Sequence, residues 1–357
     1  MPDAGLTSDP IQPGSSEAVV MSTHDQAKPR LFLSRLIPEP GLRLVREAFE
    51  VIGGTEDRPA TREELLANIG DVDAMLCLLT EPVDKDVIAA AGPRLKVISN
   101  MAVGFDNIDV AAATARGIVV TNTPGVLTEA TADLTWTLIL SLSRRVVEGD
   151  RLVREGQFPP WGPFVLLGKE VSGATLGIVG MGRIGQAVAR RAMGFGMRIL
   201  YAEHSGPLSD AQVPCGARWE YRESLEDVLR ESDIVTMHVP LNAETRHLIG
   251  EREFRVMREG SFLINTSRGP VVDEAALVEA LRSGHIGGAG LDVYEREPEL
   301  APGLVEFDNV VLLPHLGSGT VETRGRMAEM AAQNAIAVVR GEPAPSVVNP
   351  EVLTRGQ

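Results

Sequence analysis

Short apolar runs alternate with longer amphipathic or polar stretches along almost the whole chain. In the first half the runs are RLFLS (30–34), AMLCLL (74–79), LKVIS (95–99) and GIVVTN (117–122). In the second half they are ATLGIVG (174–180), MRILYAE (197–203), DIVTMHVP (233–240), GSFLINTS (260–267), GGAGLDV (287–293) and NVVLLPH (309–315). Buried parallel strands are apolar almost throughout, and crossover helices separate them. The pattern predicts an α/β protein with two Rossmann-like, doubly wound parallel-sheet domains.

Two long helical segments are expected to connect these domains. One begins near Leu127 and runs through ATADLTWTLILSLSRRVVEGDRLVREG, with Gly156 and Pro159 ending it. The other, VETRGRMAEMAAQNAIAVVRG (321–341), is expected to return and cover the first half. We therefore expect a discontinuous substrate domain (30–124 and 318–350), a dinucleotide-binding domain (125–317) and an active site in the cleft between them.

The ends and the length of the chain agree with this division. A chain of 357 residues is long enough for two full cores. Residues 1–29 are rich in Pro, Ser, Asp and Gly, so they are expected to form a disordered tail. That segment does not resemble a secretion signal, and no apolar run in the chain reaches the ~18 residues needed to span a bilayer. We therefore expect a cytoplasmic protein.

Charge and cysteine content exclude several classes of partner. The chain carries 34 Lys and Arg against 49 Asp and Glu, a formal charge of −15, and has no basic run. Nucleic acids and anionic membrane surfaces are therefore not expected partners. Its two cysteines, Cys77 and Cys215, stand too far apart for a metal motif. We expect them to be buried or incidental thiols in a reducing compartment, and we expect no metal site.

The stretch GIVGMGRIG (177–185) lies between a predicted strand and a predicted helix. A G-x-G-x-x-G pattern also occurs where glycines only let a helix pack closely on a strand. Here the strand, turn and helix follow in the order of a dinucleotide site, with Gly180 for the tight turn, Gly182 for close approach of a pyrophosphate and Gly185 for helix packing. The free N–H groups at the helix N-terminus would bind the anion. The cofactor-binding residues expected in this turn are Gly180, Met181, Gly182, Arg183, Ile184 and Gly185.

The next predicted strand ends at Glu203, followed by His204. A carboxylate there can accept hydrogen bonds from both hydroxyls of an adenosine ribose, and it would repel a 2′-phosphate. The following sequence HSGPLSD has no Arg or Lys, and His204 could neutralise a phosphate only when protonated. The alternative is that Glu203 is a solvated carboxylate at a strand end. With the glycine motif in place, we predict that NAD(H) is preferred over NADP(H).

Three later strand ends carry side chains suited to one reaction. They are Arg268 in NTSRGPVVDE, Glu297 in GLDVYEREP and His315 in LLPHLGSGT. Open α/β sheets bind ligands at the carboxyl ends of their strands. Arg268 offers a fork of donors for a carboxylate, His315 can exchange a proton near neutral pH, and Glu297 can favour its protonated form. Singly, each residue also fits a structural role. Arg268 could be a surface arginine, His315 a capping or core histidine, and Glu297 part of a solvated turn. Together they fit hydride transfer to a 2-oxo acid.

Four ordered motifs resemble those of the D-isomer-specific 2-hydroxyacid dehydrogenases, with the glyoxylate and hydroxypyruvate reductases closest. They are GMGRIGQAVARRAMGFGMRILY, NTSRGPVVDEAAL, GAGLDVYEREP and LLPHLGS. The resemblance extends from Arg30 to the C-terminus. It implies that NAD(P)H reduces glyoxylate or hydroxypyruvate to the D-2-hydroxy acid, with Arg268 anchoring the carboxylate and His315 with Glu297 as the proton donor pair.

The resemblance also implies roles for residues that the chemistry alone does not single out. It assigns Asp292 to the nicotinamide carboxamide, and the backbone N–H groups of Val103 and Gly104 to the substrate. It places Thr131, Thr266 and Ser267 along the cofactor. Trp161 matches an aromatic position that reaches towards the partner subunit's active site, or serves as an interface anchor. A homodimer is therefore expected.

Several relatives remain as alternatives. Formate dehydrogenases have glutamine where Glu297 stands, which disfavours formate. Phosphite dehydrogenases have lysine where Val103 stands, so phosphite is a weaker alternative. Another D-2-hydroxyacid dehydrogenase specificity remains open. So does an NAD(H)-sensing scaffold without turnover, because the family's transcriptional corepressors keep the same three residues.

Overall fold

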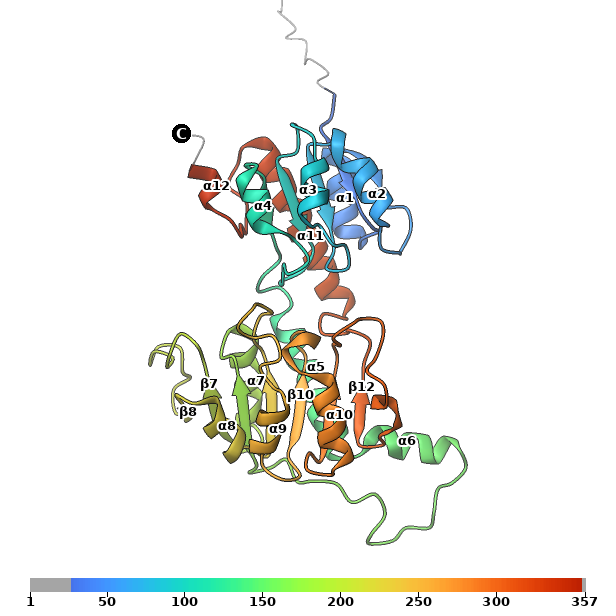
Figure 1. The fold of residues 1–357 in the computed structure, drawn as a ribbon, viewed down its shortest axis with the longest axis vertical. Helices are drawn as coiled ribbons and strands as arrows, with labels where there is room; N and C mark the ends of the chain where they lie inside the picture. Colours follow the sequence, from blue (N-terminus) through green and yellow to red (C-terminus); the bar gives the residue numbers. More distant parts are fainter. Residues whose placement is uncertain (1–26, 355–357) are drawn as a thin grey trace, which may run out of the picture.

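The computed structural model describes residues 27–354. Most of the predicted N-terminal tail, residues 1–26, lies outside the described part. Figure 1 shows two halves stacked along the long axis of the molecule, joined by the segment after β5 and by the start of α11. Within residues 27–354, no helix has the length and apolar character needed to cross a membrane.

The upper half in Figure 1 contains a five-stranded parallel sheet with the order β2-β1-β3-β4-β5. Its strands are β1 (Arg30–Leu33), β2 (Glu50–Gly53), β3 (Ala74–Cys77), β4 (Val97–Asn100) and β5 (Val119–Thr121). Its helices are α1 (Glu39–Ala48), α2 (Arg62–Asn68), α3 (Lys85–Ala90), α4 (Val110–Ala115), α11 (Val321–Arg340) and α12 (Glu351–Thr354). Alternate side chains of β1 enter two separate cores, with Leu31 and Leu33 on one face and Phe32 on the other. Both faces are therefore buried, as the continuous apolar pattern predicts.

The lower half contains a seven-stranded parallel sheet with the order β12-β11-β10-β9-β6-β7-β8. Its strands are β6 (Thr175–Val179), β7 (Arg198–Ala202), β8 (Trp219–Tyr221), β9 (Ile234–Met237), β10 (Phe262–Asn265), β11 (Gly288–Leu291) and β12 (Val310–Leu312). Its helices are α5 (Thr128–Ser143), α6 (Val146–Arg154), α7 (Arg183–Met193), α8 (Leu225–Glu231), α9 (Glu251–Val256) and α10 (Glu274–Arg282). The strand order reverses between β6 and β9, and ligands of such sheets bind at this point. The predicted class, two doubly wound parallel sheets, is confirmed.

Two features differ from the sequence expectations. The strands β2 and β8 were not expected, and each is a short strand at the edge of its sheet. The single helix expected from Leu127 to the region of Gly156 is wrong, because α5 ends at Ser143 and α6 begins at Val146. Arg145 between them has φ 51°, a left-handed conformation that stops the helical hydrogen-bond ladder. The chain therefore turns before α6.

The long helix α11 packs across the first sheet and against α1. The two helices approach most closely at Gly41, where an added Cβ would lie 2.4 Å from the main-chain carbonyl of Ala328. Gly325 in α11 is different, because its added Cβ would meet Pro40 Cγ at 3.5 Å, an ordinary contact. Only the first glycine is required by close packing.

We predict opposite effects of one methyl group at these two positions. Gly41→Ala should lower the free energy of unfolding by about 1–3 kcal/mol, because the helices must separate. Gly325→Ala should raise it by roughly 0.5–1 kcal/mol, because alanine favours a helix and fits there. Urea unfolding of the two variants and the parent measures both changes. Equal changes in the two variants would show that Gly41 does not set the distance between α1 and α11.

Candidate active site

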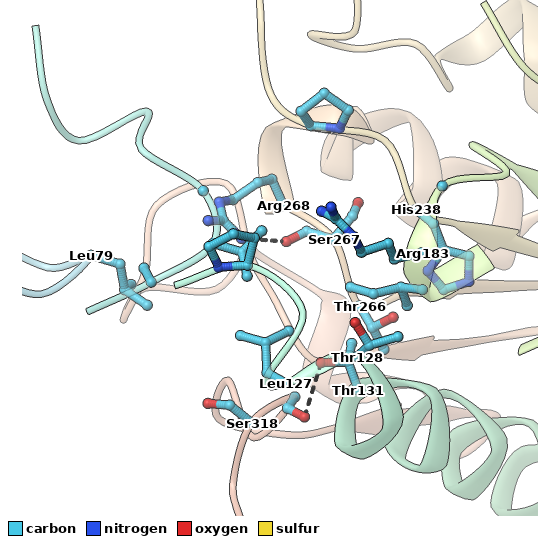
Figure 2. A pocket seen from close by; sticks show the side chains of 18 of the residues that line it. Leu79, Leu127, Thr128, Thr131, Arg183, His238, Thr266, Ser267, Arg268 and Ser318 are labelled. Atoms are coloured by element: carbon cyan, nitrogen blue, oxygen red, sulfur yellow. Dashed lines mark hydrogen bonds between the residues drawn. The ribbon is translucent and has the colours of Figure 1, made fainter. Parts of the chain in front are cut away.

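A cleft of about 420 Å³ lies between the two halves, at the carboxyl ends of strands from both sheets. The loops after the strands of the five-stranded sheet contribute Leu79, Ala102, Val103, Gly104, Phe105, Asp106 and Asn122 to its lining. The other sheet and its helices contribute Thr131, Gly182, Arg183, Ile184, His238, Thr266, Ser267, Arg268, Asp292 and His315. Figure 2 shows Leu79 and Arg268 on one side of this space, with Arg183 and His238 on the other. Most of the predicted site residues therefore meet in one cleft.

The glycine turn between β6 and α7 leaves room for a ligand. Gly180 has φ 93°, and a Cβ there would lie 2.7 Å from the carbonyl oxygen of His238. A Cβ at Gly185 would lie 2.2 Å from the carbonyl oxygen of Gly180, so this glycine brings helix and strand together. At Gly182 no heavy atom lies within 4 Å of an added Cβ. The residues present thus fit a phosphate-bearing ligand, with open space in front of Gly182 and the free N–H groups of α7 behind it.

Glu203 lies behind this turn. Its Oε2 accepts a hydrogen bond from the main-chain N–H of Met181 at 2.6 Å, while the Met181 side chain is buried in the core. The residues lining the cleft do not include Glu203 or His204. Both are on the strand end next to the glycine turn, and their contact with a ribose remains a prediction.

Arg268 reaches across the cleft to the loop that follows β4. Its Nε donates to Asp106 Oδ1 at 3.0 Å, and its Nη1 donates to the carbonyl of Ser267 at 2.8 Å. A Cβ on Gly104 would lie 1.8 Å from Arg268 Nη2, so the guanidinium lies directly against the Gly104 backbone. Gly104 must therefore be a glycine for Arg268 to occupy this place.

His315 and Glu297 form a pair in the same region. The imidazole Nδ1 lies 2.9 Å from Glu297 Oε2, and the N–H of Tyr294 donates to Glu297 Oε1 at 3.1 Å. Burial alone raises the pKa of Glu297, but the hydrogen bond and positive charge of His315 outweigh burial and hold that pKa below its usual value. Within the described residues, the other ring nitrogen of His315 has no hydrogen-bond partner, so it is available to a ligand in the cleft.

Asp292 holds the turn that carries His315. Its carboxylate accepts the N–H groups of Leu316 at 2.6 Å and Gly317 at 2.7 Å. His315 itself has φ 55°, and its N–H donates to the Asp292 carbonyl at 2.9 Å. Burial raises the pKa of Asp292 despite these bonds. Asp292 therefore fixes the unusual backbone of His315 as well as lining the cleft.

Two threonines of the expected cofactor set link α5 to the strand ends. Thr131 donates to the carbonyl of Gly317 at 3.1 Å, and Thr266 lies 2.9 Å from Thr135, hydroxyl to hydroxyl. Ser267 is hydrogen-bonded to Asn265 Oδ1 at 2.8 Å. These contacts order the floor of the cleft that Figure 2 shows below Arg268.

The sequence reasoning missed two functional candidates, Asp106 and His238. Asp106 lies in the motif VGFDNID, but nothing in the sequence shows that it pairs with Arg268. His238 follows β9, beside the reversal of strand order, and neither ring nitrogen has a hydrogen-bond partner within the described part of the chain. Burial lowers its pKa to about 3, so it is neutral. The rule that polar residues at strand ends face ligands could have found it.

Other expected residues lie apart from the cleft. Trp161 is in the segment after α6 and is 87% exposed. Cys77 is buried, which raises the pKa of its thiol, and Cys215 is exposed. Among residues 27–354, no three His, Cys, Asp or Glu side chains are grouped to hold a metal ion.

Comparison with known proteins finds relatives that match most of the chain. Residues 136–317 match the family model described as D-isomer specific 2-hydroxyacid dehydrogenase, NAD binding domain. The chain is 52% identical over 332 residues to a glyoxylate reductase of Thermofilum pendens, covering 92% of this chain and 96% of the relative.

Two solved structures share the fold over nearly their whole length. A glyoxylate reductase from Paecilomyes thermophila is similar with a TM-score of 0.81 and 34% identity, covering 91% of this chain and 100% of that one. An NADPH-dependent glyoxylate/hydroxypyruvate reductase from Sinorhizobium meliloti, in complex with NADP and malonate, is similar with a TM-score of 0.79 and 34% identity. That similarity covers 90% of this chain and 97% of the relative.

We predict that removing the imidazole changes the titration of Glu297. In His315→Gly, burial still raises the pKa of Glu297, but the imidazole that lowers it is gone. The pKa of Glu297 should therefore rise. Glycine also accepts the positive φ at this position. Carbon-13 NMR titration of the carboxyl group measures the shift, and His285→Gly, which removes an imidazole elsewhere, is the control. An unchanged titration of Glu297 in His315→Gly would contradict the pairing.

Proposed function

Because this chain belongs to the D-isomer specific 2-hydroxyacid dehydrogenase family, we propose that it reduces glyoxylate or hydroxypyruvate with NADH. It is an NAD(P)-dependent dehydrogenase that acts on 2-oxo acids. The product is the corresponding 2-hydroxy acid, of D configuration where it is chiral. Relatives named glyoxylate reductase support glyoxylate first.

One observation carries the proposal: the Arg268 guanidinium and His315, whose imidazole is paired with Glu297, line the same cleft. Arg268 can donate two parallel hydrogen bonds to a substrate carboxylate, a geometry that suits a planar guanidinium. Its Nη2 already lies against Gly104, so the N–H groups of Val103 and Gly104 can bind the same carboxylate. This anchoring places the 2-oxo group towards His315 and orients it there.

His315 supplies the proton. Glu297 accepts a hydrogen bond at Nδ1, which leaves Nε2 to donate to the carbonyl oxygen as negative charge develops on it. The carboxylate also stabilises the imidazolium that must be present before the transfer. Arg268, beside the same carbonyl, polarises it. Proton donor and electrophilic donor therefore act on one oxygen atom.

The residues that would hold the nicotinamide cofactor are those of the glycine turn and the strand ends beside it. They are Gly180, Met181, Gly182, Arg183, Ile184, Gly185, Glu203, His204, Thr131, Thr266, Ser267 and Asp292. When bound, the reduced nicotinamide supplies the hydride to the carbonyl carbon. The turn at Gly182 has the open space that a pyrophosphate needs, and Arg183 lines the cleft beside it.

We further propose that residues 30–124 and 318–350 act as the substrate domain, residues 125–317 as the dinucleotide-binding domain, and that two chains form a homodimer. Support for the dimer comes from α6 and the segment after it, which expose an unusual number of large apolar side chains. These are Val146, Val147, Val153, Phe158, Trp161, Phe164 and Leu167, each more than half exposed. Large apolar side chains gathered in exposed positions of one segment are typical of an interface. Trp161 would anchor that interface or reach the partner's active site.

The proposed function is tested with a panel of 2-oxo acids and NADH, in the parent and in Arg268→Ala. The parent should oxidise NADH fastest with glyoxylate or hydroxypyruvate. Arg268→Ala should lose about 10- to 100-fold in kcat/KM, since a hydrogen bond to a charged group is worth about 1.5–3 kcal/mol. Its affinity for NADH should change little. Arg62→Ala, which removes a surface arginine paired with Asp84, is the control.

Other results of the panel would contradict the proposal in different ways. Binding of NADH without turnover of any acid would favour a cofactor-sensing scaffold. Turnover of phosphite with NAD⁺ would favour the phosphite dehydrogenases. Normal kinetics in Arg268→Ala would remove that residue from the site.

The cofactor preference rests on Glu203. The Sinorhizobium meliloti relative is named NADPH-dependent, so the family alone does not decide between the two cofactors. We predict that the parent prefers NADH, because a carboxylate beside the glycine turn repels a 2′-phosphate. Glu203→Ser with His204→Arg should move the preference towards NADPH. The values of kcat/KM for both cofactors at pH 8 and fixed glyoxylate measure it, and a parent that favours NADPH would refute the role of Glu203.

A further inference from the structure

The loop after β4 presents three consecutive peptide groups whose carbonyl oxygens are all held. Ala102 O accepts the N–H of Thr123 at 2.8 Å, Val103 O accepts Asn122 Nδ2 at 2.8 Å, and Gly104 O accepts Asn100 Nδ2 at 2.9 Å. The loop is irregular, so no strand ladder fixes it. Two asparagine amides and one main-chain N–H take the place of a neighbouring strand.

Fixing these carbonyls also fixes the N–H groups opposite them. In a planar trans peptide the C=O and N–H point in opposite directions. The N–H of Gly104 therefore points away from the Asn122 amide that holds Val103 O. Within residues 27–354, the N–H groups of Val103, Gly104 and Phe105 have no acceptor, and all three residues line the cleft. The hydrogen bonds to the three carbonyl oxygens therefore fix the directions of the N–H groups that face the cleft.

The Asn122 amide is itself held in one orientation. Its Oδ1 accepts the hydroxyl of Ser346 at 2.7 Å, so its Nδ2 must face Val103 O. The carbonyl of Asn122 accepts Asn334 Nδ2 at 2.9 Å, and Asn334 Oδ1 accepts the N–H of Ser346 at 3.0 Å. Asn334 lies on α11 and is fully buried, and Ser346 follows that helix. Each side-chain donor and acceptor in the network has a partner.

We propose that Asn122 is a positioning residue that aims the Gly104 N–H at the substrate carboxylate, and that Ser346 and Asn334 hold its amide in the aiming orientation. The inference rests on the proposed reduction of a 2-oxo acid. It gives the chain after α11 a part in substrate recognition, although that chain does not line the cleft. Loss of the hydroxyl at Ser346 leaves the amide free to turn its oxygen towards Val103 O, where two acceptors would repel each other.

The role is tested with Asn122→Asp and Ser346→Ala. Aspartate keeps the shape of asparagine but replaces the donor to Val103 O with an acceptor. We expect KM for glyoxylate to rise at least 10-fold in Asn122→Asp and about 3- to 10-fold in Ser346→Ala, with kcat changed less than 3-fold in Ser346→Ala. A contact that binds ground state and transition state alike appears in KM. The dissociation constant for NADH should not change.

Two further variants separate positioning from general stability. Ser346→Thr keeps the hydroxyl and should restore KM towards the parent's value. Ser232→Ala removes a buried hydroxyl that donates to Val228 O at 2.6 Å in the other half of the molecule, and it should lower the thermal midpoint without raising KM. A rise in KM of the same size in Ser232→Ala would overturn the proposal, as would an unchanged KM in both Asn122→Asp and Ser346→Ala.

Calorimetric binding of oxalate to the NADH-loaded protein distinguishes this inference from the proposed function. Oxalate reports carboxylate recognition without turnover. A parent that reduces none of the acids but binds oxalate, with binding weakened 10-fold by Asn122→Asp, refutes the function and supports the inference. If the parent reduces glyoxylate, and neither Asn122→Asp nor Ser346→Ala raises KM or weakens oxalate binding, the function is supported and the inference is refuted.

Discussion

The contact of Arg268 with the loop at Gly104 joins the two halves of the molecule, and the arrangement of the cleft depends on it. The guanidinium comes from the end of β10, crosses to the loop after β4, and meets both Asp106 and the Gly104 backbone at a point where a side chain on Gly104 would displace it. Asp106 holds the guanidinium in this position, and in the proposed function a substrate carboxylate takes its place beside Asp106 as a second partner of the guanidinium. In the proposed function, this single side chain couples substrate binding to the strand end that also carries Thr266 and Ser267.

Parallel sheets explain why the remaining residues meet this arginine. Every strand of both sheets ends on the side of the cleft, so short loops after the strands deliver their side chains to the same space. The loops lack a ladder of their own, and buried polar groups replace it. Asp292 holds the turn of His315, and asparagine amides hold the turn of Gly104. The positions of His315 and of the Gly104 backbone thus depend on the side chains that hold these two turns.

Local pattern and order of motifs were enough to predict the two parallel sheets, and strand ends were enough to single out Arg268 and His315, which line one cleft, and Glu297, which pairs with His315. The edge strands β2 and β8 were missed because an edge strand is buried on fewer sides and needs no continuous apolar run. The break before α6 rests on the backbone of Arg145, which no residue type required. The roles of Asp106 and Asn122 were not predicted, because their partners Arg268 and Ser346 are more than a hundred residues away in the sequence. Only the folded chain brings them together.

The most direct measurement is a crystal structure of the protein with NADH and oxamate, an unreactive analogue of a 2-oxo acid. The account predicts the oxamate carboxylate between Arg268 and the N–H groups of Val103 and Gly104, with its carbonyl oxygen at hydrogen-bond distance from His315 Nε2. Glu297 should remain bonded to Nδ1. A carboxylate bound elsewhere, with Arg268 still paired only to Asp106, would contradict the central claim that this arginine and this loop together recognise the substrate.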